Sequence, residues 1–207
     1  MESRKTDTRS KSHSPKMAEK KPLEVMVYFA LAGITTLFVG LTMAFMFSRG
    51  PEWPVPQIPK TFWLSTVLVV ASSVLMERSW QVFQQDDVKQ LMRLTLGTAV
   101  LGLGFLIFQA LGLRELIQAG YPLSNGQPAG AYIHLLAWLH GLHLLVGIAL
   151  VATLTVRATK LMGDPVKALL YFADDDRKVR FRSIRLYWHA IGVIWAYLFF
   201  FLLFFHS

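Results

Sequence analysis

The sequence predicts an all-α protein that spans a membrane with a polytopic bundle of five helices. Only 16% of its 207 residues are charged, whereas an ordinary soluble domain has about 25%. Five stretches contain no Asp, Glu, Lys or Arg at all: 26–48, 62–76, 94–113, 131–156 and 186–206. A spanning helix needs about 20 mainly apolar residues. Four stretches meet that length, and 62–76 meets it when Glu77 and Arg78 lie at the interfacial end of its helix.

The distribution of charge accounts for the basic character of the chain. A net charge of +8 and a pI of about 9.9 would suggest a phosphate-bearing partner in a soluble protein. In membrane proteins, however, the cytoplasmic segments carry an excess of Lys and Arg. The N-terminal tail and the second and fourth connections between spans hold 18 of the 21 basic residues. We therefore expect a cytoplasmic N-terminus and a periplasmic C-terminus, and we exclude a soluble enzyme and a nucleic-acid binder.

Two further features of composition limit the possibilities. The chain has no Cys, which excludes disulfides, thiolate metal sites and cysteine nucleophiles. Residues 1–24 are rich in Ser, Lys and Arg and have no apolar core, so they are not a signal peptide. We expect a disordered basic cytoplasmic tail over 1–24, followed by one transmembrane domain over 25–207.

The first span, Met26–Ser48, carries small residues on one helical face. Gly33, Gly40 and Ala44 are spaced seven and four residues apart. Small residues let a neighbouring helix approach closely in a membrane, so we expect this face to pack against another helix. The loop that follows contains four prolines and cannot be helical throughout, and its Trp53 suits the membrane interface.

The second and third spans carry the uncharged polar side chains of the bundle. Four hydroxyl residues of 62–76 are Ser65, Thr66, Ser72 and Ser73. Such hydroxyls usually hydrogen-bond the backbone of their own helix. In the third span, Leu94–Leu113, one stripe comprises Thr98, Gly102, Phe105, Gln109 and Gly112. An amide side chain is costly in lipid, so Gln109 should face a neighbouring helix.

The fourth span, Ala131–Val156, contains three of the six histidines. Residues three and seven apart share a helix face. His140, His143 and Gly147 therefore lie together, whereas His134 points elsewhere.

The fifth span, Leu186–His206, places His189, Gly192 and Ala196 on one face that is small enough for tight packing. The connection before it contains the acidic run 174–176 beside Arg177 and Lys178. We interpret that connection as a solvated, salt-bridged loop.

The histidines allow two interpretations. His140, His143 and His189 could bind a metal or haem, because imidazole is the commonest metal ligand and polar groups inside a membrane are functional candidates. Alternatively, each ring hydrogen-bonds a neighbouring helix or a lipid headgroup. Axial haem ligands need matched depths, but His189 lies near the cytoplasmic end and the other two near mid-membrane, which favours the second interpretation. The charge-free spans also contain no Pro, so a transporter with broken helices is not indicated.

Two motifs carry a family resemblance. WLHGLHLLVG (138–147) in the fourth span and YWHAIGVIW (187–195) at the start of the fifth resemble signatures of the subunit III family of haem-copper terminal oxidases. The stretch WLSTVLVVASSVLM (63–76) and the Gly- and Gln-containing stretch 97–109 are similar to further helices of that family. The resemblance extends from Met26 to the C-terminus, and the chain looks like the short, five-helix type.

The resemblance implies an accessory role. The family's subunit III carries no haem or copper, which belong to partner subunits. It packs against catalytic subunit I, and through it subunit II, supports proton uptake from the cytoplasmic side, protects the active site during turnover and binds phospholipid in a cleft. The expected function is therefore that of a multi-pass inner-membrane subunit of a bacterial oxidase of aerobic respiration, which uses cytochrome c or quinol and translocates protons.

In this interpretation the chain has no catalytic, cofactor-binding or metal-binding residues and is a component of the enzyme complex rather than its catalytic subunit. The candidates for structural or lipid contacts are His140, His143, Gly147, His189, Trp188 and Gln109. Two alternatives stay open: an accessory subunit of a nitric-oxide reductase, and a membrane b-type haem protein that uses His140, His143 and His189.

The sequence departs from the family at two intramembrane acids. The family often has a carboxylate in the helix that corresponds to the first span, where FALAGITT (29–36) offers only Gly33 or Ile34. The family's final motif is often followed by Val-Asp, whereas residues 190–192 here are Ala, Ile and Gly. Both departures put a carboxylate-based proton role in doubt and leave a scaffold role intact.

Overall fold

The computed structural model describes residues 22–50, 57–123 and 128–206 and contains six helices and no strand over these ranges. The helices are α1 (Pro22–Ser48), α2 (Lys60–Phe83), α3 (Val88–Gln118), α4 (Pro128–Leu161), α5 (Pro165–Ala173) and α6 (Asp175–His206). All except α5 are long and apolar enough to cross a membrane. The predicted all-α fold with five spans is confirmed. Residues 1–21 of the expected tail, and Trp53, lie outside the described residues.

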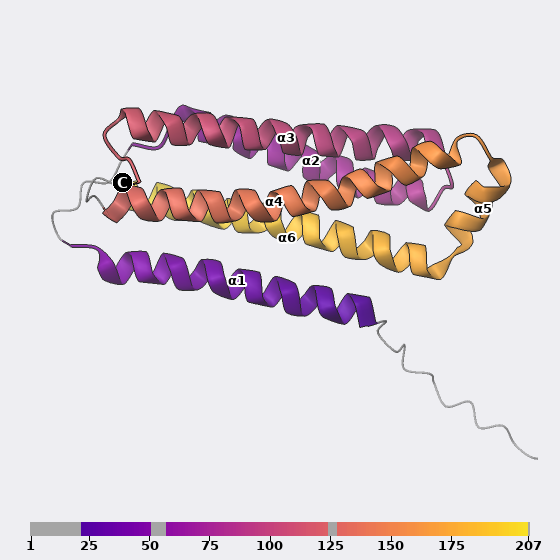
Figure 1. Ribbon diagram of the computed structural model, residues 1–207, viewed down its shortest axis with the longest axis horizontal. Coiled ribbons are helices and arrows are strands. Elements are labelled where there is room, and N and C mark those ends of the chain that lie inside the picture. The colour runs from indigo at the N-terminus through magenta and orange to yellow at the C-terminus, as the bar shows by residue number, and fades with distance from the viewer. Residues whose placement is uncertain (1–21, 51–56, 124–127, 207) are drawn as a thin grey trace, which may run out of the picture.

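The long helices lie side by side and alternate in direction (Figure 1). Helices α2, α3, α4 and α6 each contact two of the others and form a closed four-helix ring, while α1 packs outside this ring against α4 and α6. The short helix α5, the α2–α3 turn and the start of α1 share one end of the bundle, which we call the α5 end (Figure 1).

Every span extends beyond its charge-free stretch at one end or both, because a helix continues through polar residues once it leaves the apolar region. Helix α2 runs six residues past Glu77 to Phe83, so the expectation that Glu77 lies at a helix end is wrong. The α2–α3 turn has Asp86 at φ 60°, a left-handed conformation that Asp tolerates. Asp87 then caps α3 by accepting a hydrogen bond from the Gln90 backbone N–H at 3.0 Å.

The connection before α6 is helical, not the loop that the sequence suggests. Asp164 caps α5 by accepting hydrogen bonds from the backbone N–H groups of residues 166 and 167. Asp174 accepts from the backbone N–H of Asp176 at 2.8 Å, and Asp175 and Asp176 form the first turn of α6. Acidic residues are favourable there because a helix N-terminus carries partial positive charge. The predicted ion pairs are present, including Arg177–Asp174 at 3.4 Å.

One aromatic group from each helix of the ring meets at its centre. The Trp195 ring of α6 lies 5.7 Å from Phe62 of α2, 5.1 Å from Phe105 of α3 and 5.5 Å from His140 of α4, measured between centroids. All four side chains are almost fully buried. The contacts of Trp195 with Phe62 and Phe105 are edge-to-face, and that with His140 is tilted. Aromatic contacts of this kind are favourable beyond the area they bury, so they help to fix how the four helices pack.

Helix α1 uses large side chains, not its small ones, to join the bundle. Its buried residues include Phe38 and Phe45, whereas an added Cβ at Gly33 or Gly40 would meet no described atom within 4 Å. The expectation that these glycines pack against another helix of this chain is therefore wrong. The aromatic residues lie on the inward face, which leaves Gly33 and Gly40 exposed on the outward one.

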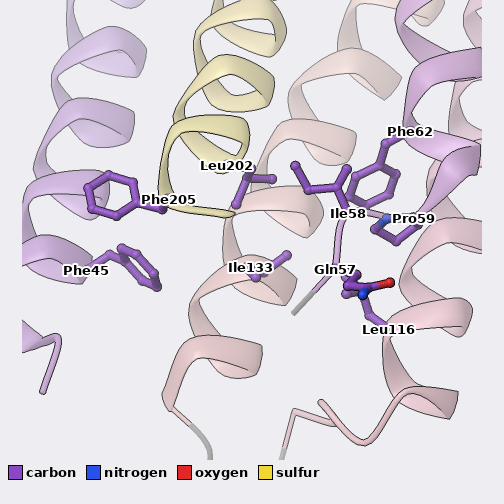
Figure 2. Close-up of a pocket in the computed structure, with 9 residues that line it drawn as sticks. All are labelled: Phe45, Gln57, Ile58, Pro59, Phe62, Leu116, Ile133, Leu202 and Phe205. Atoms are coloured by element: carbon purple, nitrogen blue, oxygen red, sulfur yellow. The ribbon is translucent and has the colours of Figure 1, made fainter. Parts of the chain in front are cut away.

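The end of the bundle opposite α5 is closed by apolar side chains. Figure 2 shows Phe45 of α1 beside Phe205 of α6, with Ile133 of α4 and Phe62 of α2 also lining the small pocket between the helices. The Phe45 and Phe205 rings are 5.7 Å apart. The pocket has a volume of only about 10 Å³, so it is a packing gap and not a binding site.

Candidate functional site

The polar side chains inside the ring form a ladder along α2. Ser65 and Thr66 donate hydrogen bonds to the Phe62 carbonyl at 2.9 and 2.8 Å, and Ser72 donates to the Val69 carbonyl at 2.8 Å. The prediction that these hydroxyls bond their own helix is confirmed for Ser65, Thr66 and Ser72. Because each hydroxyl proton is used in this way, each oxygen is left as an acceptor toward the neighbouring helices.

Each of these oxygens accepts a hydrogen bond from another helix of the ring. The three donors are Gln109 Nε2 to Ser65 at 3.2 Å, Trp188 Nε1 to Ser72 at 3.3 Å and Trp195 Nε1 to Thr66 at 3.0 Å. The expected orientation of Gln109 toward a neighbouring helix is confirmed. The ladder provides acceptors for two buried indole N–H groups and for the NH₂ group of Gln109 without any charged group, as a membrane interior requires.

Two glycines hold the Trp188 side chain between α3 and α4. A Cβ added at Gly147 would lie 3.3 Å from a carbon of the Trp188 ring and 3.3 Å from a carbon of Tyr187. A Cβ added at Gly102 would lie 2.8 Å from Trp188 Cη2. Gly147 of the first motif and Trp188 of the second are thus packing partners. The absence of a side chain at Gly147 leaves the space that the indole of Trp188 occupies.

His140 behaves as an aromatic side chain. It is fully buried, and neither ring nitrogen has a hydrogen-bond partner among the described residues. Its ring lies between Phe38 at 6.2 Å, Phe105 at 5.5 Å and Trp195 at 5.5 Å. The expected hydrogen bond from His140 to a neighbouring helix is therefore absent from the part of the chain that the structure describes.

His143 and His134 bond their own helix, α4. His143 Nδ1 lies 2.7 Å from the Leu139 carbonyl, and the His143 carbonyl accepts a hydrogen bond from Tyr187 Oη at 2.9 Å. His134 Nδ1 lies 2.8 Å from the Gly130 carbonyl, and its Nε2 is buried without a described partner. The His143 side chain does not reach another helix by a hydrogen bond, so its link to α6 runs through its backbone.

A cluster of Glu77, Arg185 and His189 lies between α2 and α6. The two carboxylate oxygens of Glu77 lie 3.3 Å from Arg185 Nη1 and 3.3 Å from His189 Nε2. The Arg185 guanidinium also lies 5.2 Å from the centroid of the Trp80 ring. These three polar side chains remain 29–45% exposed, so the cluster is on the side of the bundle and not in its core.

Sequence reasoning missed this cluster because it treated Glu77 as a residue of the interface. One signal was available. Arg185 and His189 are four residues apart, so they share a helix face, and a single acid follows the charge-free part of the second span. The His189 interaction with another helix is of the kind expected, although its partner is a carboxylate and not a backbone group.

The histidines proposed for a haem do not meet at one place. His143 contacts Phe38 at 5.8 Å between ring centroids and lies with His140, whereas His189 is bound to Glu77. Among the described ranges, no group of three or more His, Cys, Asp or Glu side chains is placed to hold a metal ion. The three residues of the haem alternative are therefore divided between two parts of the bundle.

A groove of about 500 Å³ lies at the α5 end between α1, α4 and α6. The residues that line it include the apolar Val27 and Leu150 and the basic Arg157 and Arg180. The two arginines form no ion pair among the described residues. The Ser183 hydroxyl in its wall is buried and lacks a described partner. Two guanidinium groups and apolar side chains in one groove suit an anionic headgroup with an attached hydrocarbon chain.

Comparison with known proteins identifies relatives over almost the whole chain. The family model described as cytochrome c oxidase subunit III matches residues 21–207. Among similar curated proteins, cytochrome c oxidase subunit 3 of Bacillus sp. (strain PS3) is 29% identical over 177 residues, which cover 82% of this chain and 79% of the relative. The protein of the same name from Ornithorhynchus anatinus is 26% identical over 199 residues, or 90% of this chain and 70% of the relative.

Proposed function

The chain belongs to the cytochrome c oxidase subunit III family, and we propose that it is the non-redox accessory subunit of a bacterial aerobic terminal oxidase. In this role it stabilises catalytic subunit I, binds lipid and supports proton uptake. Haem and copper reside in the partner subunits. The observation that carries the proposal is the family match, which extends from residue 21 to the C-terminus and includes every described helix.

The geometry of the motif residues supports an accessory role. Gly147, Trp188 and His140 are used in helix packing, and Gln109 is bonded to the hydroxyl ladder of α2. Their contacts make the ring of helices rigid and leave the outer faces for partners. The outward glycines of α1, Gly33 and Gly40, are suited to close approach by a helix of another subunit.

The α5 end is the cytoplasmic side in this proposal, and the chain lies in the bacterial inner membrane. The start of α1, the α2–α3 turn and the α4–α6 connection meet there (Figure 1). The stretches 78–93 and 157–185 around the two connections carry 11 of the 14 basic residues in the described ranges. The C-terminus then faces the periplasm. The Glu77–His189 pair lies toward the same end, and a partly exposed carboxylate beside an imidazole is our candidate for a role in proton uptake.

The groove between α1, α4 and α6 is our candidate for the lipid site. An anionic phospholipid would place its phosphate against Arg157 and Arg180 and its acyl chains along Val27 and Leu150. Each basic residue near an anionic headgroup contributes about 1 kcal/mol.

Purification of the tagged chain from its native membranes tests the assignment. We expect a large subunit with haem and copper spectra to co-purify, and subunit II with it, while the separated chain shows no Soret band. Recovery with a nitric-oxide-reducing partner would support the first alternative instead. A stoichiometric b-type haem on the separated chain would overturn the accessory role.

A further inference from the structure

The short helix α5 carries an exposed apolar face outside the charge-free stretches of the spans. Residues three and four apart share a face of a helix, so Val166, Leu169 and Leu170 lie together. Their exposed fractions are 68%, 66% and 65%. We call this set the apolar face of α5. Three large aliphatic side chains side by side are unfavourable in water, so we expect an apolar environment to cover them.

The other two faces of α5 have different surroundings. Phe172 is buried, and its ring lies 5.1 Å from that of Phe83 at the end of α2. The third face holds Lys167, whose side chain is 73% exposed, and Tyr171, whose ring centroid lies 5.5 Å from the Arg177 guanidinium. At 100° per residue the three faces are roughly 110–130° apart. The helix therefore has one side for the bundle, one for an apolar phase and one for water.

Helix α5 begins just beyond the apolar region of the spans. Thr155 Oγ1 donates a hydrogen bond to Thr95 Oγ1 at 3.0 Å, so the charge-free stretches of α3 and α4 reach the same level at the α5 end. Helix α4 continues from Thr155 only to Leu161, which is at most about 9 Å at 1.5 Å per residue. The chain then turns, and α5 runs across the end of the bundle (Figure 1). Lipid headgroups occupy the layer directly outside the hydrocarbon core, so α5 lies at their level.

The charge around α5 is complementary to an anionic membrane surface. The stretch 157–182 contains seven basic residues and four acidic ones. Two of the acids are paired locally, Asp164 with Lys167 at 2.9 Å and Asp175 with Lys178 at 3.6 Å. The surplus is positive, and basic residues near the surface are attracted to anionic headgroups. A helix with an apolar face and basic surroundings is typical of one that lies in the plane of the interface.

We propose that α5 is an interfacial helix that anchors this end of the chain in the headgroup layer of an anionic phospholipid bilayer. Val166, Leu169 and Leu170 enter the lipid, and Lys167 stays on the water side. Lipid is favoured over a second protein as the cover, because the three faces match a position where bundle, bilayer and water meet and because the charge complements the headgroups. The inference depends on the five spans and not on the proposed role in an oxidase.

Site-directed spin labelling tests the proposal directly, because the chain has no Cys. Val166→Cys and Leu170→Cys place a nitroxide on the apolar face, and Lys167→Cys, on the same helix, is the water-facing control. The full-length chain, with any subunits it retains, is reconstituted in vesicles of phosphatidylethanolamine and phosphatidylglycerol, and the unaltered chain gives the background. The collision rate of each label is measured with oxygen, which concentrates in lipid, and with a water-soluble nickel chelate.

The three labels give distinct results for lipid, water and protein. We expect oxygen collisions to exceed nickel collisions at positions 166 and 170, and the reverse at position 167. Nickel collisions at 166 and 170 that are as frequent as at 167 would place the apolar face in water. Labels at 166 and 170 that neither reagent reaches would place it against a protein. Either of these results overturns the proposal.

A double variant tests whether the apolar face holds α5 in place. Val166→Ala with Leu170→Ala removes apolar surface while Ala, the best helix former, favours the helix itself. In the same vesicles we expect amide hydrogen exchange over 169–173 to be faster than in Lys167→Ala, the matched control, in which Asp164 still accepts from the backbone of α5. A helix free of lipid would exchange no faster in the double variant, and that result would contradict the proposal. If the double variant does not fold, the labels at the three exposed positions still decide.

Discussion

Replacing Gly102 by Ala tests whether the fit of Trp188 between α3 and α4 stabilises the bundle. The added methyl group would lie 2.8 Å from Trp188 Cη2 and 3.1 Å from Ile148 Cγ1. The first distance is too short for any ordinary carbon contact, so the indole or a helix must move. The indole cannot move freely, because its N–H donates to Ser72 on the opposite side of the ring of helices. Overpacking of a filled interior costs about 1–3 kcal/mol.

Gly40→Ala is the matched control, because its added methyl group would meet no described atom within 4 Å. Both substitutions replace a helical Gly, and both gain up to about 1 kcal/mol from helix propensity. This gain cancels in the comparison, and the remaining difference measures packing against Trp188. We therefore expect the free energy of unfolding of Gly102→Ala to be about 1–3 kcal/mol below that of Gly40→Ala.

The measurement is reversible unfolding in mixed micelles, followed by far-ultraviolet circular dichroism for the helices and by near-ultraviolet circular dichroism for the tryptophans. Gly102→Ala should lower the midpoint of unfolding and change the near-ultraviolet signal of the folded state, whereas Gly40→Ala should do neither. Equal stability of the two variants would refute the argument that the motif residues act through close packing.

Three further substitutions test other parts of the bundle. Glu77→Gln removes the negative charge that contacts both Arg185 and His189. Because the cluster is partly exposed, we expect the free energy of unfolding to fall by about 1 kcal/mol or less. A loss several times larger would contradict the weak contribution that this exposure indicates. The Lys167 side chain and backbone N–H both donate to Asp164 and hold the pKa of that carboxyl below its ordinary value. The stabilisation of α5 by the Asp164 cap is therefore fully present above the ordinary carboxyl pKa, and it is lost as the pH falls through the lowered pKa of Asp164. Amide hydrogen exchange over 165–173 should accordingly increase at acidic pH, and in Asp164→Ala it should be fast at every pH; exchange in the unaltered chain that does not respond to acid would contradict this. Arg157→Gln should reduce the anionic phospholipid that co-purifies, while Arg93→Gln, an exposed arginine of α3, should not; equal retention in both would remove the lipid assignment of the groove.

The number and type of the helices could be predicted because the membrane imposes one simple requirement. Backbone groups in lipid must be bonded within the chain, so a long charge-free stretch has to be helical. The helix ends could not be predicted in this way, since the absence of charge marks the apolar region and not the end of backbone hydrogen bonding. Helix α5 was missed for a related reason: its capping residue Asp164 and the acidic start of α6 look like a solvated loop when only composition is considered.

The face that each helix buries was predicted correctly for the third span but not for the first, and the reason is the size of the side chains. The stripe that contains Gly102 and Gln109 could be identified because polar and small groups coincide with one face of the third span. On α1 the same reasoning failed, since Phe38 and Phe45 rather than Gly33 and Gly40 determine which face is buried within this chain. A stripe of small residues indicates where a helix can approach closely, but it does not say whether that helix belongs to the same chain.

The contacts of the two motifs give two histidines of the spans different structural roles. His140 fills a site that is closed by Phe38, Phe105 and Trp195, and a ring with aromatic neighbours on several sides has little room to coordinate an external group. His189 is bound to Glu77, and its ring is therefore positioned by a charge on another helix. One histidine thus contributes shape and the other links two helices by an electrostatic contact. A substitution that keeps the shape of His140, such as His140→Phe, should therefore preserve more of the stability than His140→Ala, whereas for His189 the same pair of substitutions should be nearly equivalent, because both lose the contact with Glu77. Thermal unfolding of the four variants distinguishes these roles, and the opposite order at either position would show that the role assigned to that histidine is wrong.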